Sequence, residues 1–303
     1  MSTNLPAGKT KMIQKRGLLA FVFMVALAGI CAAQSASIDM VYVTAAVTGA
    51  KKAPALDLKV ENFQVLEEKV EQKITFFAPP DGLWDINIIL ANSKLLPGRA
   101  DRESAAIRDA VETFKSTSNP QDKIKVDELH FGSDGMFDAI DRNLVDLQKT
   151  TNPRRALIVI NDDFDMPGGD AINGLIEFSR KLNIPIYFLY TKTNSTDPTV
   201  QSTGARGDTY KNPEGEGLTN IAEQTGGSIY FVDVLHQLET QCKLLAQELR
   251  TRYVLGFKST NDKKDDKWRK LQVKMIPPAG QKLDVSAKGK YFVPKPLEPG
   301  AKK

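Results

Sequence analysis

The chain has 303 residues, of which 41% are hydrophobic and 26% are charged. This balance excludes a fibrous or wholly disordered chain and is typical of one large or two smaller globular domains. A formal net charge of +4 would indicate a nucleic-acid or membrane-surface partner if the folded part carried it. The charge lies instead in the first 33 residues, which contain Lys9, Lys11, Lys15 and Arg16 and no acidic residue. The rest is close to neutral, so the sequence favours no nucleic-acid ligand.

Segment 1–33 has the three parts of a secretory signal peptide: a cationic start, the apolar run Leu18–Cys31, and small residues before Gln34. The run has 14 residues, fewer than the roughly 20 that a spanning helix needs. A retained membrane anchor is therefore the weaker alternative. A lipoprotein is weaker still, because Ile30 stands where a lipid-attachment motif needs a small residue. We expect a periplasmic or extracellular protein with no transmembrane segment in its mature chain.

Cysteine and histidine are scarce. Once Cys31 is removed with the leader, Cys242 remains alone, which excludes an intramolecular disulfide and a zinc site built from several thiolates. Cys242 also falls on the apolar stripe of the helix expected near residues 236–250, so we expect a core residue and not a reactive thiol. His130 and His236 stand far apart and form no metalloprotease motif.

The expected elements change character along the chain. Segment 34–80 contains three short strands, at Met40–Val43, Phe63–Leu66 and Ile74–Phe77. Segment 81–250 alternates continuous apolar runs with stretches of helical period, which predicts parallel strands covered on both faces. The expected strands are Ile86–Leu90, Ala156–Ile160, Ile184–Tyr190 and Ile229–Val232; the expected helices carry Ile107–Phe114, Phe137–Leu147, Ile172–Phe178 and Leu238–Leu249. The predicted fold is a doubly wound, mostly parallel α/β sheet with β extensions at both ends.

Segment 251–294 returns to β patterning. Strands are expected at Tyr253–Phe257, Trp268–Met275 and Leu283–Val293, with a hairpin loop at Asn261–Lys267. Thr191–Gly217 is the longest expected loop, and residues 295–303 form a Pro/Lys-rich tail. Neither β segment is large enough to be stable alone, so we expect the two to pack on each other or on the α/β domain.

Three motifs indicate a family. The run Glu248–Phe257, followed by Trp268–Leu271 and Lys288–Phe292, resembles the C-terminal signature of bacterial VWFA-related domain proteins. Leu58–Phe77 resembles the segment that precedes their von Willebrand factor A domain, and Ala222–Gly227 resembles a helix-to-strand corner of the family. The resemblance covers roughly residues 38–294.

The resemblance implies a ligand site at the C-terminal edge of the parallel sheet. In family members with an intact site, a divalent cation such as Mg²⁺ is held there by an Asp-x-Ser-x-Ser motif, a Thr and an Asp, all oxygen ligands. This chain departs from that pattern: Ala91 stands in place of the first Asp, Leu95 in place of the second Ser, and Asp134 in place of the Thr. Only Ser93 and Asp162 match.

Two interpretations remain open. In the first, the cation site is lost, Lys94 supplies positive charge in its place, and the domain binds a protein partner through Asn92, Ser93, Lys94, Asp134 and Asp162. In the second, the carboxylate gained at Asp134 compensates for the one lost at position 91. Ser93, Asp134 and Asp162 then form a rewired metal site for Mg²⁺ or another divalent cation. Asp163 and Asp165, in the same loop as Asp162, are expected to be surface residues.

No pattern indicates catalysis. The sequence contains no nucleophile elbow, no Walker loop and no dinucleotide fingerprint. We therefore expect a non-catalytic, exported protein-interaction module with no required cofactor and an unidentified protein partner. The alternative is an envelope assembly or scaffolding subunit that makes contacts through its β segments.

Overall fold

The computed structural model describes residues 40–91, 100–129, 135–161, 168–191, 213–232 and 237–293. The expected signal peptide and C-terminal tail lie outside these residues. Chain contacts separate Met1–Asp39 from Met40–Lys303, and all described residues belong to the second unit. Among the described helices, none combines the length and apolar character needed to cross a membrane.

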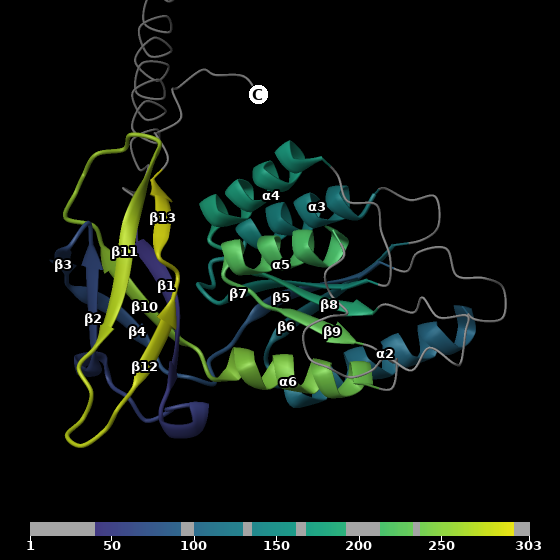
Figure 1. Ribbon diagram of the computed structural model, residues 1–303, viewed down its shortest axis with the longest axis horizontal. Helices are drawn as coiled ribbons and strands as arrows, with labels where there is room; N and C mark the ends of the chain where they lie inside the picture. Colours follow the sequence, from purple (N-terminus) through teal and green to yellow (C-terminus); the bar gives the residue numbers. More distant parts are fainter. Residues whose placement is uncertain are drawn as a thin grey trace, which may run out of the picture. The chain divides into compact units, whose positions relative to one another are not determined.

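A five-stranded parallel sheet forms the centre of the α/β domain, with the order β6-β5-β7-β8-β9 (Figure 1). Every residue of β5, β8 and most of β7 is buried, as continuous apolar runs predict for strands covered on both faces. The strands are β5 (Asp85–Ala91), β6 (Lys123–Leu129), β7 (Arg155–Asn161), β8 (Ile186–Thr191) and β9 (Ile229–Val232). The expected doubly wound α/β fold is confirmed.

Two groups of helices cover the two faces of this sheet (Figure 1). On one face, α2 (Ala100–Thr117) and α6 (Leu238–Arg250) bury Phe114, Leu245 and their neighbours against Ile86, Ile88 and Ile158. On the other, α3 (Met136–Gln148), α4 (Gly169–Leu182) and α5 (Pro213–Thr225) bury Ile140, Leu175 and Leu218 against Ile89, Val159 and Phe188. The two hydrophobic layers fix each strand between helices.

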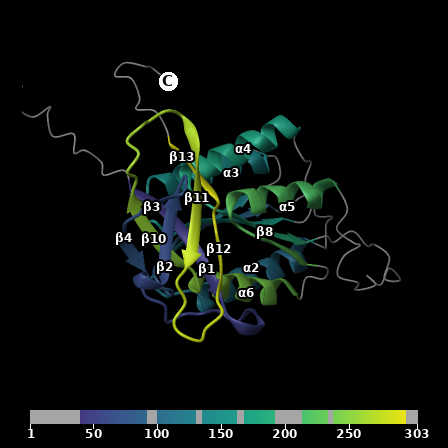
Figure 2. The same cartoon turned by 60° about the vertical axis from the view of Figure 1, so that its left-hand side comes forward.

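The remaining strands form two antiparallel four-stranded sheets, here called the sandwich. The first has the order β12-β1-β10-β4 and the second β13-β11-β2-β3. In Figure 2, β2 and β11 lie in front of β1 and β10. Their inward side chains form one core that includes Val43, Phe63, Tyr253 and Leu271. The bounds are β1 (Met40–Thr48), β2 (Phe63–Glu67), β3 (Val70–Gln72), β4 (Ile74–Ala78), β10 (Tyr253–Lys258), β11 (Lys267–Met275), β12 (Asp284–Ala287) and β13 (Lys290–Val293).

The expected packing of the two β segments on each other is confirmed. The central pairs of both sheets join the N-terminal segment to the C-terminal one: β1 pairs with β10, and β2 pairs with β11. Neither segment supplies a whole sheet, so both are needed before the apolar faces can be covered.

Two details of the C-terminal segment were predicted wrongly. Asn261–Lys267 is no hairpin loop, because β10 and β11 belong to different sheets and the loop crosses between them. Leu283–Val293 is not one strand: β12 pairs with β1 and β13 pairs with β11. In each case the alternation of apolar residues was read correctly, but a strand's partner depends on distant residues.

Two elements of the α/β domain escaped the sequence analysis. The edge strand β6 carries the charged residues Lys123, Lys125, Asp127 and Glu128. Charges on an edge strand oppose its pairing with another chain, but they also obscure the apolar pattern that indicates a strand in the sequence. Helix α5 starts at Pro213, inside the expected loop 191–217. Proline is favoured in the first turn of a helix because its missing N–H has no partner there in any case.

The corner after α5 requires glycine twice. Gly226 has φ of +91°, a left-handed conformation that ends the helix. A Cβ on Gly227 would lie 2.0 Å from the carbonyl oxygen of Ile186. The Ala222–Gly227 motif therefore has a local structural cause: β9 can approach β8 only because this position has no side chain.

Cys242 lies in the core between α6 and the sheet, with 1% of its surface exposed. Burial, assisted by the charge of Glu239, raises the pKa of its thiol to about 12. Thiolate is the reactive form, so we expect an aromatic disulfide reagent at pH 8 to leave Cys242 unmodified in the native protein and to modify it fully in denaturant. Rapid labelling under native conditions would contradict this packing.

Candidate functional site

The strand order places a topological switch point between β5 and β7. From β5 the chain crosses one face of the sheet through α2 to reach β6, then returns over the other face through α3 to reach β7. The loops after β5 and β7 therefore diverge, which opens a crevice at the carboxyl ends of the strands in folds of this kind. We call this edge of the sheet the switch edge.

Three strands end in register at the switch edge. Ala91, the last residue of β5, pairs with Leu129 at the end of β6 and with Asn161 at the end of β7. Two of the segments that contain candidate site residues begin directly after Ala91 and Asn161. The third, which contains Asp134, lies between Leu129 and α3 in the sequence. The backbone therefore starts all three segments from one edge, as the sequence analysis expected of this fold.

The candidate side chains themselves lie outside the described residues. Asn92, Ser93 and Lys94 follow Ala91, Asp162 follows Asn161, and Asp134 precedes α3 by two positions. Their contacts, and their value as partner-binding residues or metal ligands, stay predictions. The structure describes the strand ends that these segments follow in the chain.

Ala91, at the end of β5, contributes no polar side-chain group to the switch edge. Its methyl group is 8% exposed and belongs to the hydrophobic cluster that includes Met136 and Ile140. A carboxylate at this position would have to leave that cluster or be buried in it, and burying an unpaired charge is costly. Ala91 instead contributes to the apolar packing of α3 on the sheet.

Asn161 is a polar feature of the switch edge that the sequence analysis did not select. It is 1% exposed, and neither its Oδ1 nor its Nδ2 has a hydrogen-bond partner among the described residues. Its backbone oxygen accepts a bond of 3.1 Å from Oγ1 of Thr191, which ends β8. An unsatisfied buried amide costs about 1–3 kcal/mol. The sequence signal that could have identified Asn161 is an amide side chain at the end of an otherwise apolar, buried strand.

The described residues of the switch edge do not by themselves fit a divalent cation. Ala91 and Leu129 offer no side-chain oxygen, while Asn161 offers an amide oxygen and Thr191 a hydroxyl. Mg²⁺ and Ca²⁺ are usually bound through carboxylates. Within the described part of the chain, no three His, Cys, Asp or Glu side chains come close enough together to hold a metal.

A buried pair of side-chain amides joins α3 to the sheet. Nδ2 of Asn87, in β5, donates to Oδ1 of Asn143 in α3 over 2.9 Å, and both residues are at most 5% exposed. Nδ2 of Asn143 donates in turn to Oδ2 of Asp127 in β6 over 2.7 Å. The pair therefore links α3 to β5 and β6.

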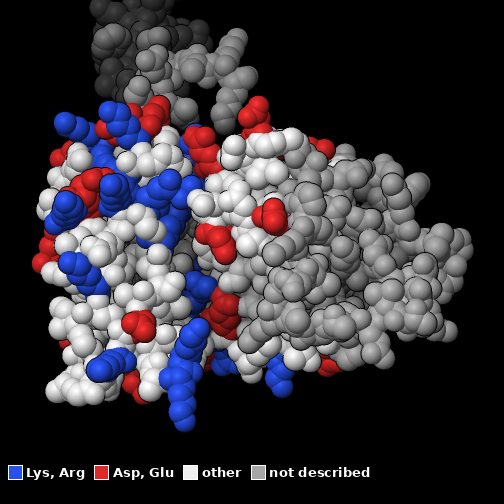
Figure 3. Space-filling model, viewed as in Figure 1, with Lys and Arg blue, Asp and Glu red and all other residues white. Residues whose placement is uncertain are grey.

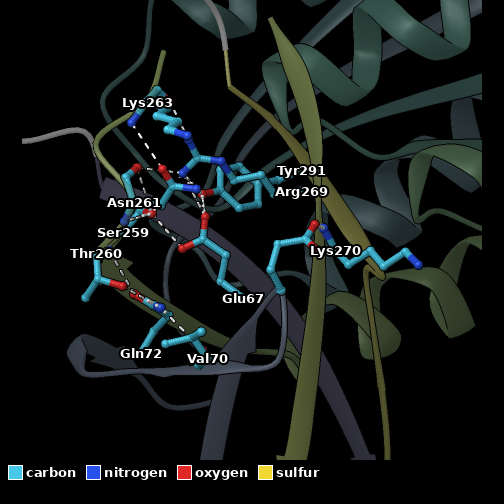
Figure 4. Close-up of polar contacts among 11 residues, drawn as sticks. Glu67, Val70, Gln72, Ser259, Thr260, Asn261, Lys263, Arg269, Lys270 and Tyr291 are labelled. Atoms are coloured by element: carbon cyan, nitrogen blue, oxygen red, sulfur yellow. Dashed lines mark hydrogen bonds and ion pairs between the residues drawn. The ribbon is translucent and has the colours of Figure 1, made fainter. Parts of the chain in front are cut away.

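A second polar cluster lies inside the sandwich (Figure 4). Nη1 of Arg269 lies 2.8 Å from Oε1 of Glu67, and the two side chains are 5% and 2% exposed. The hydroxyls of Tyr291 and Ser259 each donate to Glu67 over 2.6 Å. Burial, together with the bond to Glu67, raises the pKa of Tyr291 to about 12.

The same cluster fixes the loop that crosses between the two sheets. Arg269 donates to the backbone oxygens of Asn261, over 2.7 Å, and of Lys263. Gln72 accepts from the backbone N–H of Thr260 over 3.0 Å. Each strong donor and acceptor is used within the cluster, so we assign it a structural role and not a binding role.

The outer surface of the sandwich carries positive charge. Lysine and arginine side chains gather over β11 and β13 in Figure 3. Lys267, Lys270 and Lys274 of β11 are exposed. This surface is the one that the scaffolding alternative would use.

No protein-family model matches the chain, and no curated protein matches it. Among solved structures, the chain is similar to a von Willebrand factor type A protein from Catenulispora acidiphila, with a TM-score of 0.41 and 10% identity over 78% of this chain and 74% of that chain. It is also similar to an aerotolerance-related membrane protein from Bacteroides fragilis NCTC 9343 carrying multiple mutations to serines. That match has a TM-score of 0.34 and 18% identity over 55% of this chain and 98% of that one.

The azoreductase AzrA matches with a TM-score of 0.25 and 10% identity over 54% of this chain and 95% of its own. Identities of 10% to 18% assign no residue roles to this chain.

Proposed function

We propose that the chain is an exported, non-catalytic protein-interaction module that binds a protein partner at the switch edge without a cation. One observation carries the proposal. Three strands end in register at a topological switch point, yet the position where the family's first metal ligand belongs is Ala91, buried in apolar packing. The amide of Asn161 at the same edge supports it: it has no hydrogen-bond partner among the described residues, and a partner's polar group can supply one.

Binding without a cation follows from the charges available. Lys94 follows Ala91 by three positions in the sequence and supplies a fixed positive charge to a partner's acidic group, while Asn92 and Ser93 supply neutral hydrogen-bonding groups. A partner then recognises shape and hydrogen bonds, with no metal completing its contacts. Catalysis is not part of the proposal, since no nucleophile–base pair has been identified.

Titration calorimetry of the protein with Mg²⁺, Mn²⁺ and Ca²⁺ tests the absence of a cation. We expect no saturable heat, because Ala91 removes a carboxylate that the family's site requires. A saturable heat that disappears in Asp162→Ala would contradict the proposal and establish the rewired site of Ser93, Asp134 and Asp162. Asp170→Ala, in the first turn of α4, is the control for a non-specific loss of charge.

Mapping the bound partner tests the location of the face. The tagged protein captures its partner from its own cell envelope, and variants Asn92→Ala, Lys94→Ala, Asp134→Ala and Asp162→Ala should each weaken capture. Lys270→Ala and Lys274→Ala on the outer face of β11 should leave capture unchanged. The reverse pattern would overturn the switch edge and favour scaffolding through the sandwich. An activity screen on phosphoesters and glycosides, compared with Asp162→Ala, tests the non-catalytic assignment.

A further inference from the structure

A cavity of about 350 Å³ lies where the α/β domain meets the sandwich. The C-terminal ends of α4 and α5 line it on one side, and Thr44 of β1, Ser286 of β12 and Lys288 line it on the other. Pro185 and Ser228, which precede β8 and β9, also line it. The cavity therefore lies at the amino ends of the parallel strands, the edge opposite the proposed partner-binding face.

Two cationic residues that line this cavity, Lys288 and Arg180, form no ion pair within the described residues. Nζ of Lys288 donates to the backbone oxygen of Arg180 over 3.2 Å and to Oδ1 of Asn183 over 3.1 Å, both neutral acceptors. The guanidinium of Arg180 lies 5.0 Å from the ring centre of Trp268, and its buried Nε has no hydrogen-bond partner among the described residues. In the described part of the chain, neither cation forms an ion pair with a carboxylate.

The remaining charges leave the cavity positive. Arg252 also lines it, but Glu248 neutralises Arg252 at 2.5 Å, and Glu223 is the one acidic residue among the lining residues that the structure describes. Like charges repel, the more so where water is excluded. Burial and the neighbouring charge of Arg180 lower the pKa of Lys288 to about 7, so the ammonium form is disfavoured in the free protein and an anion beside it would favour it.

We propose that this cavity binds a small organic molecule through one oxyanion group, a carboxylate or a phosphate, held between Lys288 and Arg180. Its volume of about 350 Å³ falls in the ~300–1,000 Å³ range of small-molecule sites. Thr44, Ser228 and Ser286, each with a hydroxyl, also line it. They provide hydrogen-bonding groups for the rest of the ligand.

Lys288 also has a structural role, since its bonds to Arg180 and Asn183 cap the C-terminus of α4. Capping alone makes the protein less stable when Lys288 is changed, but it creates no dependence on anions. Proton uptake distinguishes the two roles. A ligand that requires the ammonium form raises the pKa of Lys288 and draws a proton from the buffer on binding.

The test uses sulfate, which remains a dianion throughout the neutral range and so takes up no proton itself. Calorimetric titration of the full chain at pH 8, in two buffers of different ionisation enthalpy, should give saturable binding with uptake of roughly one proton. Lys288→Gln should weaken sulfate binding about tenfold or more. Lys288→Arg should keep the binding and lose the proton uptake, because arginine stays charged.

Lys282→Gln is the matched control, since Lys282 is an exposed lysine of the same segment and should behave as the native protein. Circular dichroism melts check that every variant is folded. Absence of sulfate binding, binding unchanged in Lys288→Gln, or heats independent of the buffer in the native protein would each overturn the proposal. Displacement of sulfate by acetate assigns a carboxylate ligand and displacement by methyl phosphate a phosphate; displacement by neither also overturns it. None of these outcomes bears on the switch edge.

Discussion

A chain that ends after Arg250 is expected not to form the sandwich. It should also lose the cooperative unfolding transition that the full chain shows at its melting temperature. The truncation removes β10 and β11, each of which lies between two partners in its sheet, together with β12 and β13. β1 and β4 then have no common neighbour, and Tyr253, Leu255 and Phe257 leave the core. Burial of one large apolar side chain contributes roughly 1.5–3 kcal/mol, so the loss of these three, together with the core side chains of β11 and β13, is comparable with the ~5–15 kcal/mol stability of typical proteins.

The α/β domain should be affected as well. The guanidinium of Arg154, which precedes β7, donates to the backbone oxygens of Ala78 and Arg252, both over 3.2 Å. Nδ2 of Asn183 donates to the backbone oxygen of Tyr42 over 2.9 Å. These bonds depend on the sandwich being formed.

Calorimetry and limited proteolysis measure the outcome. The matched control is a chain that ends after Val293, the last residue of β13, which should melt as the full chain does. An unchanged melting temperature in the chain that ends at Arg250 would refute the interdependence of the two β segments.

Glu67→Gln is expected to destabilise the protein by about 3–5 kcal/mol, because it leaves the guanidinium of Arg269 buried without its counter-charge. Tyr291 and Ser259 also lose a charged acceptor. For a domain of this size, such a change lowers the melting temperature by roughly 10 °C.

Glu112→Gln is the matched control for Glu67→Gln. Glu112 pairs with Lys115 at 2.7 Å, much as Glu67 pairs with Arg269 at 2.8 Å, but its side chain is 70% exposed. Surface pairs contribute ~0–1 kcal/mol, so the control should be close to the native protein in urea denaturation. Equal effects of the two substitutions would show that the cluster is not what holds the crossing loop.

The double variant Glu67→Leu/Arg269→Met separates pairing from packing. Removing both charges leaves no uncompensated ion, so the double variant should be more stable than either single substitution at these positions. If the double variant instead loses as much stability as the two single substitutions together, Glu67 and Arg269 contribute independently, and their pairing adds nothing to the stability.

The candidate site could be located from the sequence only as an edge of the sheet. The apolar runs Ile86–Leu90 and Ala156–Ile160 predict parallel strands, and carboxyl ends of parallel strands share an edge. The motif comparison showed that position 91 lacks a carboxylate, and the structure adds that its methyl group packs in the core. That the amide of Asn161 has no partner among the described residues was not predictable, since a polar residue's hydrogen-bond partners depend on what tertiary packing brings beside it.

The cavity at Lys288 could not be predicted at all. Its cations come from α4 and from the turn between β12 and β13, and residues 180 and 288 are brought together only when the sandwich docks against the α/β domain. Nothing in the local sequence of either segment marks the pair.

The sequence by itself determined the buried strands β5, β7 and β8, most of the helices, and the core position of Cys242, because residue spacing along one element decides which side chains can share a face. The tertiary structure decided which strands pair, that Asn261–Lys267 crosses between sheets, and that Glu67 meets Arg269. Those outcomes join residues far apart in the chain, and their energies arise from burial and hydrogen bonding that no local pattern contains.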